Sequence, residues 1–244
     1  MKVVNAVWEK RNLGVDVVEV ICSEQDTEDQ LLSILASIDL PYSVVKVPSG
    51  CVKLLWAAQR AGYYFIETSF NYECNIQRIK TPELYNRFLN HVSVAVATDD
   101  LISRALDEIK SGSIFSTDRV AIDPYFSKEI AGVRYYNWCK DALSKGAIME
   151  VAFYNDEPIA FNISEEMVGR KGVVHGLLGG VFESALDKGL GFLLVDCEVD
   201  CCRSLGGKIC AGATTSNNLS ALRLHMRYGF EIVESNYVLV KHNM

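Results

Sequence analysis

Residues 188–194, KGLGFLL, form a short glycine-bearing segment that could bind an anion. Gly189 and Gly191 precede a predicted helix, and glycine lets a charged group approach the backbone closely. N–H groups at a helix N-terminus attract negative charge, and Lys188 adds a positive side chain. A dinucleotide fingerprint would need glycine where Leu194 stands, and a Walker loop would need Gly-Lys-Ser/Thr. The segment therefore predicts a phosphate-binding loop of another kind, with a plain strand-to-helix turn as the alternative.

A second segment, NNLSALRLHMRYGF at residues 217–230, places an asparagine and a histidine on one face of a predicted helix. His225 follows Asn218 by seven residues, which is about two helical turns. The asparagine amide can hold a ligand through hydrogen bonds, and an imidazolium can donate a proton near neutral pH. Tyr228 lies almost one turn beyond His225 and is an alternative proton donor.

Taken in order, these two segments resemble the GNAT (GCN5-related) N-acetyltransferase superfamily, and the resemblance covers roughly residues 92–241. In that superfamily a strand ending in valine leads into Q/R-x-x-G-x-G/A, a helix, a strand, N-x-x-A-x-x-L-Y and then G-F. The residues in register here are Val181, Gly189, Gly191, Asn218, Ala221, Leu224, Gly229 and Phe230. Within the superfamily, the chain is similar to the TDP-fucosamine (sugar-nucleotide) acetyltransferase group in its N-terminal extension, its RYYNW helix and its terminal VESNYVLVK.

The resemblance implies an enzyme that uses acetyl-CoA as co-substrate, without a metal. The acceptor amine would attack the thioester directly, and a backbone N–H near Gly180 and Val181 would hold the oxyanion. Asn218 would bind the pantetheine arm. His225 stands where the superfamily usually has tyrosine, and would protonate the leaving thiolate. The alternatives are that His225 only fills the space of the tyrosine, or that Tyr228 reaches the sulfur. Leu186 replaces the usual Gln or Arg, so the pyrophosphate would rest on backbone N–H groups of Asp187, Lys188, Gly189, Leu190, Gly191 and Phe192.

The acceptor is expected to be a small-molecule amine, such as a nucleotide-linked amino sugar. Arg134, Tyr135 and Trp138 would line its site, because arginine pairs with diphosphates and aromatic rings stack on bases. The alternative is that the aromatic residues belong to the core and the arginine to the surface. Candidates for the base that deprotonates the amine are Glu165, Glu166 and Glu183. Two other functions stay open: a protein or peptide N-acetyltransferase, and a non-catalytic module that binds acyl-CoA.

The composition narrows the class of partner. The net charge of −7 over 244 residues argues against nucleic acid, whose binding depends on basic patches. No apolar run reaches the roughly 18 residues of a membrane span, and no signal peptide is visible, so we expect a cytoplasmic protein and no membrane partner. The cysteines show no CxxC pair and favour no zinc site. A homodimer is compatible with the sequence.

Alternating helices and strands predict an α/β fold that positions these segments. The resemblance implies a GNAT fold, with a mixed central sheet of splayed strands flanked by helices, and an N-terminal α/β extension domain. We expect the extension at residues 1–85 and the acetyltransferase domain at residues 92–244, and we expect the extension to pack against the acceptor site. Strands are predicted at residues 15–22, 42–47, 64–74, 92–97, 147–154, 158–164, 172–181, 208–214 and 230–241. Helices are predicted at residues 27–38, 51–63, 101–109, 192–205 and 220–227, with another around Arg134.

Overall fold

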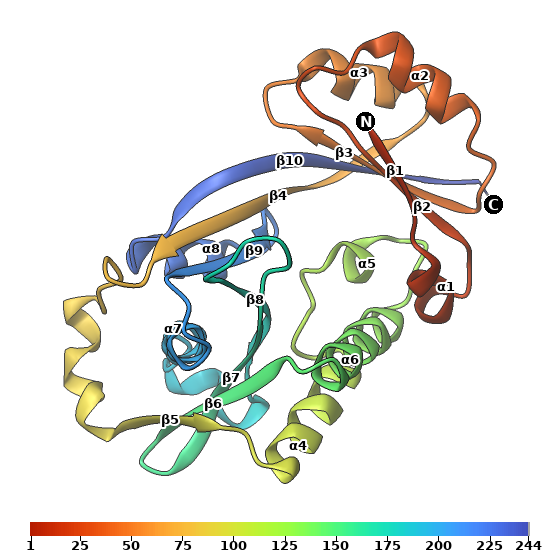
Figure 1. The fold of residues 1–244 in the computed structure, drawn as a ribbon. Coiled ribbons are helices and arrows are strands. Elements are labelled where there is room, and N and C mark those ends of the chain that lie inside the picture. Colours follow the sequence, from red (N-terminus) through yellow and green to blue (C-terminus); the bar gives the residue numbers. More distant parts are fainter. Residues whose placement is uncertain (244) are drawn as a thin grey trace.

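The computed structural model describes residues 1–243. Ten strands form one mixed sheet in the order β1-β2-β3-β10-β4-β9-β8-β7-β6-β5, with helices packed against it (Figure 1). This confirms the predicted α/β fold. The strands are β1 (Lys2–Asn5), β2 (Val17–Ile21), β3 (Tyr42–Pro48), β4 (Tyr64–Asn75), β5 (Val92–Val96), β6 (Ile148–Tyr154), β7 (Glu157–Glu166), β8 (Val173–Val181), β9 (Ile209–Thr215) and β10 (Glu231–His242). The helices are α1 (Val7–Leu13), α2 (Glu28–Ala36), α3 (Val52–Arg60), α4 (Asp99–Lys110), α5 (Arg119–Ile122), α6 (Lys128–Ser144), α7 (Leu193–Ser204) and α8 (Leu219–Arg227), with 3₁₀ helices η1 (Glu83–His91) and η2 (Glu183–Lys188).

Local signals in the sequence set several element boundaries. Thr27 begins α2 with a capping box, in which its side chain accepts the N–H of Gln30 and its own N–H is bound by the Gln30 side chain. Thr98 caps α4 through its hydroxyl. Asn155 and Asp156 both have positive φ, the conformation of a two-residue hairpin turn, and they join β6 to β7.

Five elements are missing from the sequence prediction. β1 and α1 occupy the first 14 residues, where no element is predicted, because two short elements give too weak a periodic signal. The 3₁₀ helices η1 and η2 and the short helix α5 occupy segments where no helix is predicted. The end of the chain, for which the sequence allows one or two strands, is the single strand β10.

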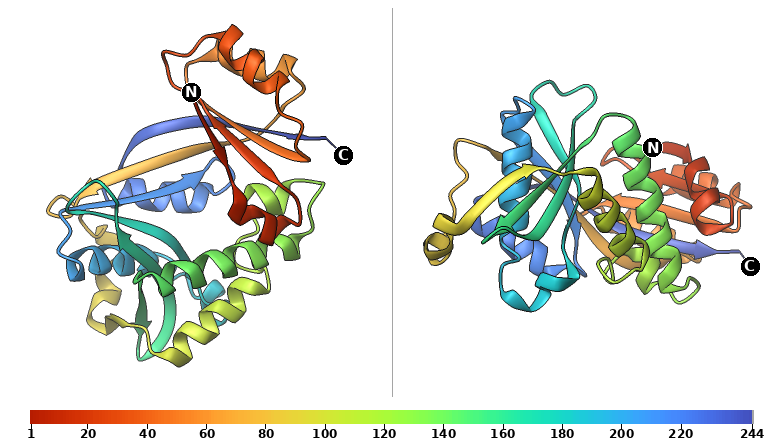
Figure 2. Two further views of the ribbon diagram at one scale, coloured as in Figure 1. Left: turned by 45° about the vertical axis from the view of Figure 1, so that its right-hand side comes forward. Right: turned by 90° about the horizontal axis from the view of Figure 1, so that it is seen from below.

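The strand β6, which lies next to the edge strand β5, is buried on both faces over Val151 and Ala152. On β6, Val151 packs in a cluster with residues of α4 and α6, whereas the neighbouring Ala152 packs in a cluster with residues of α7. Successive side chains of a strand point to opposite faces, so these helices form layers on the two sides of the sheet (Figure 2).

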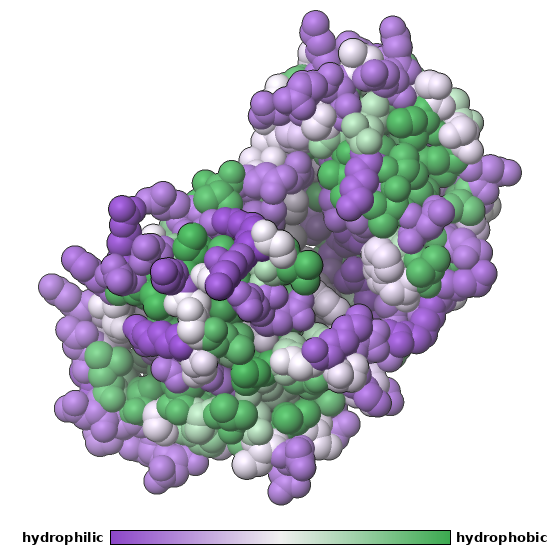
Figure 3. All heavy atoms as spheres, in the orientation of Figure 1, coloured by the Kyte–Doolittle hydropathy of each residue, from purple (hydrophilic) through white to green (hydrophobic). Residues whose placement is uncertain are grey.

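The N-terminal lobe comprises β1, β2, β3, α2 and α3, and shares the end of β10 with the rest of the sheet. Leu239 of β10 packs in one core cluster with Val45 of β3 and Leu54 of α3. β4, which belongs to the same N-terminal part of the sequence, lies between β10 and β9 in the middle of the sheet. The sheet is thus continuous across the predicted boundary at residues 85–92, and the division into two folding units stays a prediction. Figure 3 shows the surface hollowed between the lobe and the remainder of the molecule.

Candidate functional site

The parallel strands β8 and β9 pair only over a short stretch and then separate. Residues 173–176 of β8 pair with residues 209–212 of β9. Beyond them, β8 continues beside β7 to Val181, and β9 continues beside β4 to Thr215. The sheet therefore has a wedge-shaped opening, and Gly176 and Gly212 form its vertex.

A cleft of about 400 Å³ extends from this opening towards the N-terminal lobe. Its walls include the buried carboxylates Glu67 of β4 and Glu198 of α7, neither of which the sequence singles out. The loop at residues 187–192 lies outside its walls. The cleft brings together five of the predicted site residues, namely Arg134, Tyr135, Trp138, Asn218 and His225.

The glycine loop presents backbone N–H groups at the start of α7. Gly189 has φ of +68° and ends η2 in the left-handed conformation. The first backbone bond of the new helix joins the N–H of Leu193 to the carbonyl of Leu190. Within residues 1–243 the structure gives no acceptor for the N–H groups of Leu190, Gly191 and Phe192. Free N–H groups at a helix N-terminus suit an anion.

The side chains of the same loop are engaged elsewhere. Lys188 forms an ion pair with Glu157, a surface residue of β7. Leu190 and Phe192 are buried in the core cluster of α7, and Asp187 is exposed. An anion at this loop would therefore be held by the backbone, as the sequence predicts, and Lys188 would have to leave Glu157 to assist.

The strand β8 directs two N–H groups into the opening. Phe182 donates its N–H to the carbonyl of Ile159 on β7, and N–H groups alternate in direction along a strand. The N–H of Gly180 therefore also points to β7, whereas those of Gly179 and Val181 point away from it, into the opening. Of the two residues near which the oxyanion is expected, Val181 therefore directs its own N–H into the opening, whereas the N–H of Gly180 serves the sheet; that either residue binds an oxyanion stays a prediction.

His225 lies at the wall of the cleft and is only 2% exposed. Its Nδ1 donates to the carbonyl of Ala221 at 2.7 Å, which fixes a proton on that nitrogen. Its Nε2 lies 2.8 Å from Glu198 Oε2 and 3.0 Å from the hydroxyl of Tyr72. Burial lowers the pKa of His225, but the Glu198 carboxylate outweighs it and raises the pKa above its ordinary value. The arrangement therefore favours an imidazolium.

Two other predicted residues lie as follows. The side-chain oxygen of Asn218 accepts the N–H of Ala221 at 3.1 Å and so caps α8, which leaves its NH₂ group for a ligand. The hydroxyl of Tyr228 lies 3.4 Å from Asp196, is buried in the core, and belongs to a side chain outside the cleft walls. Tyr228 is therefore not placed to act as the alternative proton donor.

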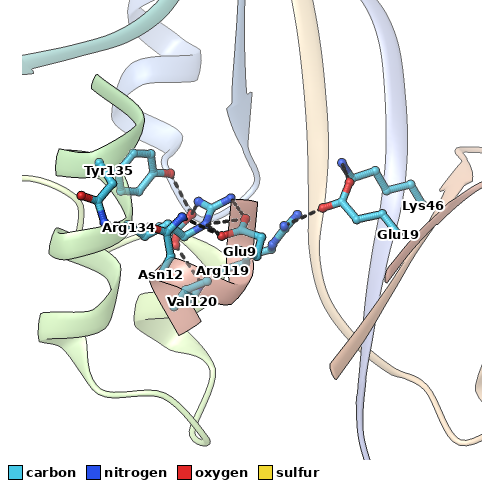
Figure 4. Close-up of polar contacts among 10 residues, drawn as sticks. Glu9, Asn12, Glu19, Lys46, Arg119, Val120, Arg134 and Tyr135 are labelled. Carbon is cyan, nitrogen blue, oxygen red and sulfur yellow. Dashed lines mark hydrogen bonds and ion pairs between the residues drawn. The ribbon is translucent and has the colours of Figure 1, made fainter. Parts of the chain in front are cut away.

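Two of the predicted acceptor residues, Arg134 and Tyr135, belong to a network of polar contacts among α1, β2, α5 and α6 (Figure 4). Arg134 donates to Glu9 of α1, with Nη2 2.7 Å and Nε 2.8 Å from Oε1. Tyr135 donates its hydroxyl to Asp118 at 2.7 Å. Glu19 of β2 pairs with Arg119 at 2.8 Å. Arg134 is thus already neutralised, and its role in acceptor binding stays a prediction.

Replacing Glu9 with alanine is expected to destabilise the protein by about 3 kcal/mol, because it leaves the mostly buried Arg134 without its main counter-ion. The measurement is the free energy of unfolding from urea titration. Asp16→Ala is the matched control, since Asp16 pairs with Lys10 on the surface and its loss is expected to cost less than about 1 kcal/mol. Equal effects of the two substitutions would contradict the role of the Glu9–Arg134 pair.

A second cavity of about 510 Å³ adjoins the cleft and shares Arg119, Arg134 and Trp138 with it. Its walls include Trp8 of α1, which is 49% exposed, and Trp138, which is 40% exposed. Glu19 of β2 and Lys46 of β3 also line this cavity, so the N-terminal lobe borders it; that the cavity takes the acceptor stays a prediction. Trp8 was not predicted, and the sequence gives no signal for its exposure, because it directly follows the apolar residues Ala6 and Val7.

The carboxylates predicted as bases do not gather at the cleft. Glu165 lines the second cavity, whereas Glu166 and Glu183 are exposed. Glu67 is the buried alternative at the cleft; burial raises its pKa, and Arg119 opposes this shift.

Residues 1–243 contain no helix that is both long and apolar enough to cross a membrane. In the same part of the chain, no group of three or more His, Cys, Asp or Glu side chains is arranged to hold a metal ion.

No family model and no curated protein matches the chain. Solved structures match its fold. A GCN5-related N-acetyltransferase from Sphaerobacter thermophilus has a TM-score of 0.55 and 13% identity, over 82% of this chain and 59% of that one. A GCN5-related N-acetyltransferase from Kribbella flavida has a TM-score of 0.56 and 15% identity, over 93% of this chain and 81% of that one. The glucosamine N-acetyltransferase region of a fungal multi-domain β-N-acetylglucosaminidase has a TM-score of 0.55 and 14% identity, over 81% of this chain and 25% of that one.

These likenesses establish that the chain has the GNAT fold, as predicted. The chain spans less than two thirds of the Sphaerobacter protein, at 59% of its length. The likeness to the TDP-fucosamine acetyltransferase group stays a prediction.

Proposed function

We propose that the protein is an acyltransferase that moves the acetyl group of acetyl-CoA to the primary amine of a small molecule. The observation that carries the proposal is the wedge-shaped opening between β8 and β9, beside a loop with free N–H groups at the start of α7. Acetyl-CoA has the matching shape, an extended pantetheine arm that ends in a pyrophosphate. The neighbours of the same fold that are named N-acetyltransferases support this activity.

The residues at the opening take distinct roles in this reaction. The N–H groups of residues 187–192 hold the pyrophosphate, and the NH₂ group of Asn218 binds the pantetheine arm. The amine attacks the thioester carbon, and the N–H groups of Gly179 and Val181 stabilise the oxyanion that forms. The fixed direction of these donors supplies the stabilisation without rearrangement of the strand.

The acceptor we propose is an amino sugar that enters through the second cavity. Exposed tryptophans such as Trp8 and Trp138 can pack on the apolar face of a sugar ring, and the surrounding charged and amide side chains can bind its hydroxyls. A neighbour of this fold is named a glucosamine N-acetyltransferase region, which supports the class. A nucleotide-linked amino sugar is the finer form of the proposal; its diphosphate would have to compete with Glu9 for Arg134.

The test is release of free thiol from acetyl-CoA in the presence of amino sugars, their nucleotide conjugates, polyamines and peptides. We expect turnover with amino sugars, and an acetylated product by mass spectrometry. Replacing Trp8 with alanine is expected to raise the acceptor KM about tenfold, the effect of losing about 1.4 kcal/mol of contact, with the KM for acetyl-CoA unchanged. Trp56→Ala is the control, because Trp56 is exposed on α3 and lies outside both cavities.

Other outcomes distinguish the alternatives. Turnover with peptides only would make the protein a peptide N-acetyltransferase. Acetyl-CoA binding without turnover on any amine would make it a non-catalytic acyl-CoA-binding module.

A further inference from the structure

Tyr72 of β4 places its hydroxyl directly beside the ring of His225. The phenol oxygen lies 3.0 Å from Nε2, and the two ring centroids are 4.3 Å apart. Both side chains line the cleft although both are buried. Within residues 1–243, His225 is the one hydrogen-bond partner that the structure gives this hydroxyl.

The donor and acceptor roles around His225 leave the hydroxyl proton of Tyr72 without an acceptor in the described chain. Nδ1 of His225 donates to the carbonyl of Ala221, so the ring is anchored on its own helix. In the imidazolium, the Nε2–H lies between Glu198 Oε2 and the oxygen of Tyr72, and both oxygens accept it. The hydroxyl of Tyr72 therefore does not donate to the histidine, and its hydrogen can point into the cleft.

The glycines of the vertex make room for this group of side chains. A Cβ on Gly212 would lie 2.6 Å from the ring of Tyr72, and a Cβ on Gly176 would lie 2.8 Å from Glu198 Oε1. The two side chains thus lie directly over the backbone where β8 and β9 part. Glu198 Oε1 is buried and has no hydrogen-bond partner in the described chain. The negative charge of the Glu198 carboxylate is therefore balanced mainly by His225, which contacts its other oxygen.

We propose that Tyr72 protonates the leaving thiolate, with His225 and Glu198 behind it as the group that restores its proton. This proposal rests on the proposed function. The acceptor nitrogen bonds to the carbonyl carbon, the carbon–sulfur bond breaks, and its electron pair goes to sulfur. Sulfur takes the phenol proton, the phenolate takes the Nε2 proton of His225, and the proton released by the amine is returned to His225 through water.

The environment of Tyr72 keeps its hydroxyl protonated before the reaction begins. Burial raises the pKa of Tyr72 well above its ordinary value, so the phenol is protonated at neutral pH and gives its proton to sulfur only as His225 replaces it. The nearby carboxylate of Glu198 acts in the same direction. Tyr72 thereby supplies, from a central strand, the phenol that the superfamily carries on the helix at the position of His225.

The test is Tyr72→Phe, which keeps the ring over Gly212 and removes only the hydroxyl. With acetyl-CoA we expect kcat to fall roughly 100-fold, the usual contribution of a general acid, with the KM for acetyl-CoA kept. With p-nitrophenyl thioacetate, whose thiolate leaves without a proton, we expect the loss to shrink to about threefold or less. Tyr228→Phe is the matched control and is expected to stay within about threefold of wild type with both thioesters.

Two results overturn the assignment while the proposed function stands. One is a Tyr72→Phe variant that turns over acetyl-CoA as fast as the Tyr228→Phe variant does. The other is an equal loss with both thioesters, which would mean that the substitution disturbs the site as a whole. Wild-type protein that turns over neither thioester would instead refute the proposed function, and the assignment with it.

Discussion

A variant that starts at Gln77 is expected to be insoluble, because it lacks a strand from the middle of the sheet. β4 pairs with β10 on one side and with β9 on the other, so its loss leaves two long strand edges unpaired. The variant also lacks Val45 and Leu54, which cover Leu239 of β10 in the core of the N-terminal lobe. Unpaired edges and exposed apolar surface both promote aggregation.

The measurement is soluble yield and size-exclusion behaviour after expression. Deletion of residues 1–5 is the control, because it removes only the edge strand β1, and this variant is expected to stay soluble. A soluble, monodisperse variant starting at Gln77 that binds acetyl-CoA would show that residues 92–244 fold independently, and would contradict the prediction.

Replacing Gly189 with valine is expected to weaken acetyl-CoA binding by about tenfold to 100-fold, as measured by calorimetry. Gly189 has φ of +68°, and a β-branched residue held there costs roughly 1–3 kcal/mol. A Cβ at this position meets no atom within 4 Å, so the effect comes from backbone strain rather than from a clash. Relief of the strain would turn the free N–H groups of Leu190 and Gly191 away from the pyrophosphate.

Gly169→Val is the matched control for this substitution. Gly169 also has positive φ, at +81°, and open space around its Cβ position, but it lies in the turn between β7 and β8, at the opposite end of β8 from the loop. It is expected to cost similar stability and leave acetyl-CoA binding unchanged. If Gly189→Val binds acetyl-CoA as tightly as Gly169→Val does, residues 187–192 do not hold the pyrophosphate.

The proposed catalytic centre could be predicted only in part. His225 and Asn218 stand out because their spacing on one helix is a local property. Glu198 carried a weaker local signal, since it lies three residues beyond Val195 on the buried side of α7. Tyr72 carried no such signal. It is 153 residues from His225 and reaches it only because β4 is inserted beside β9.

The charge partner of Arg134 was also hidden from the sequence, because it comes from a distant segment of the chain. An arginine next to aromatic residues suggests a ligand for diphosphate, and the sequence holds nothing to show that its charge is already used. Glu9 lies 125 residues earlier, on a helix too short to be predicted, and it is the packing of α1 against α6 that brings the pair together.

By itself the sequence determined what depends on neighbouring residues. These features are the α/β class, the caps at Thr27 and Thr98, the hairpin turn at Asn155 and the glycine loop before α7, because each follows from backbone preferences within a few residues. The tertiary structure decided the strand order, and with it which side chains from distant segments meet at the vertex. Distant strands pair in the order that best buries the apolar faces of the sheet and pairs the strand edges. The free energy gained in this way depends on the whole chain, so no short segment reveals it.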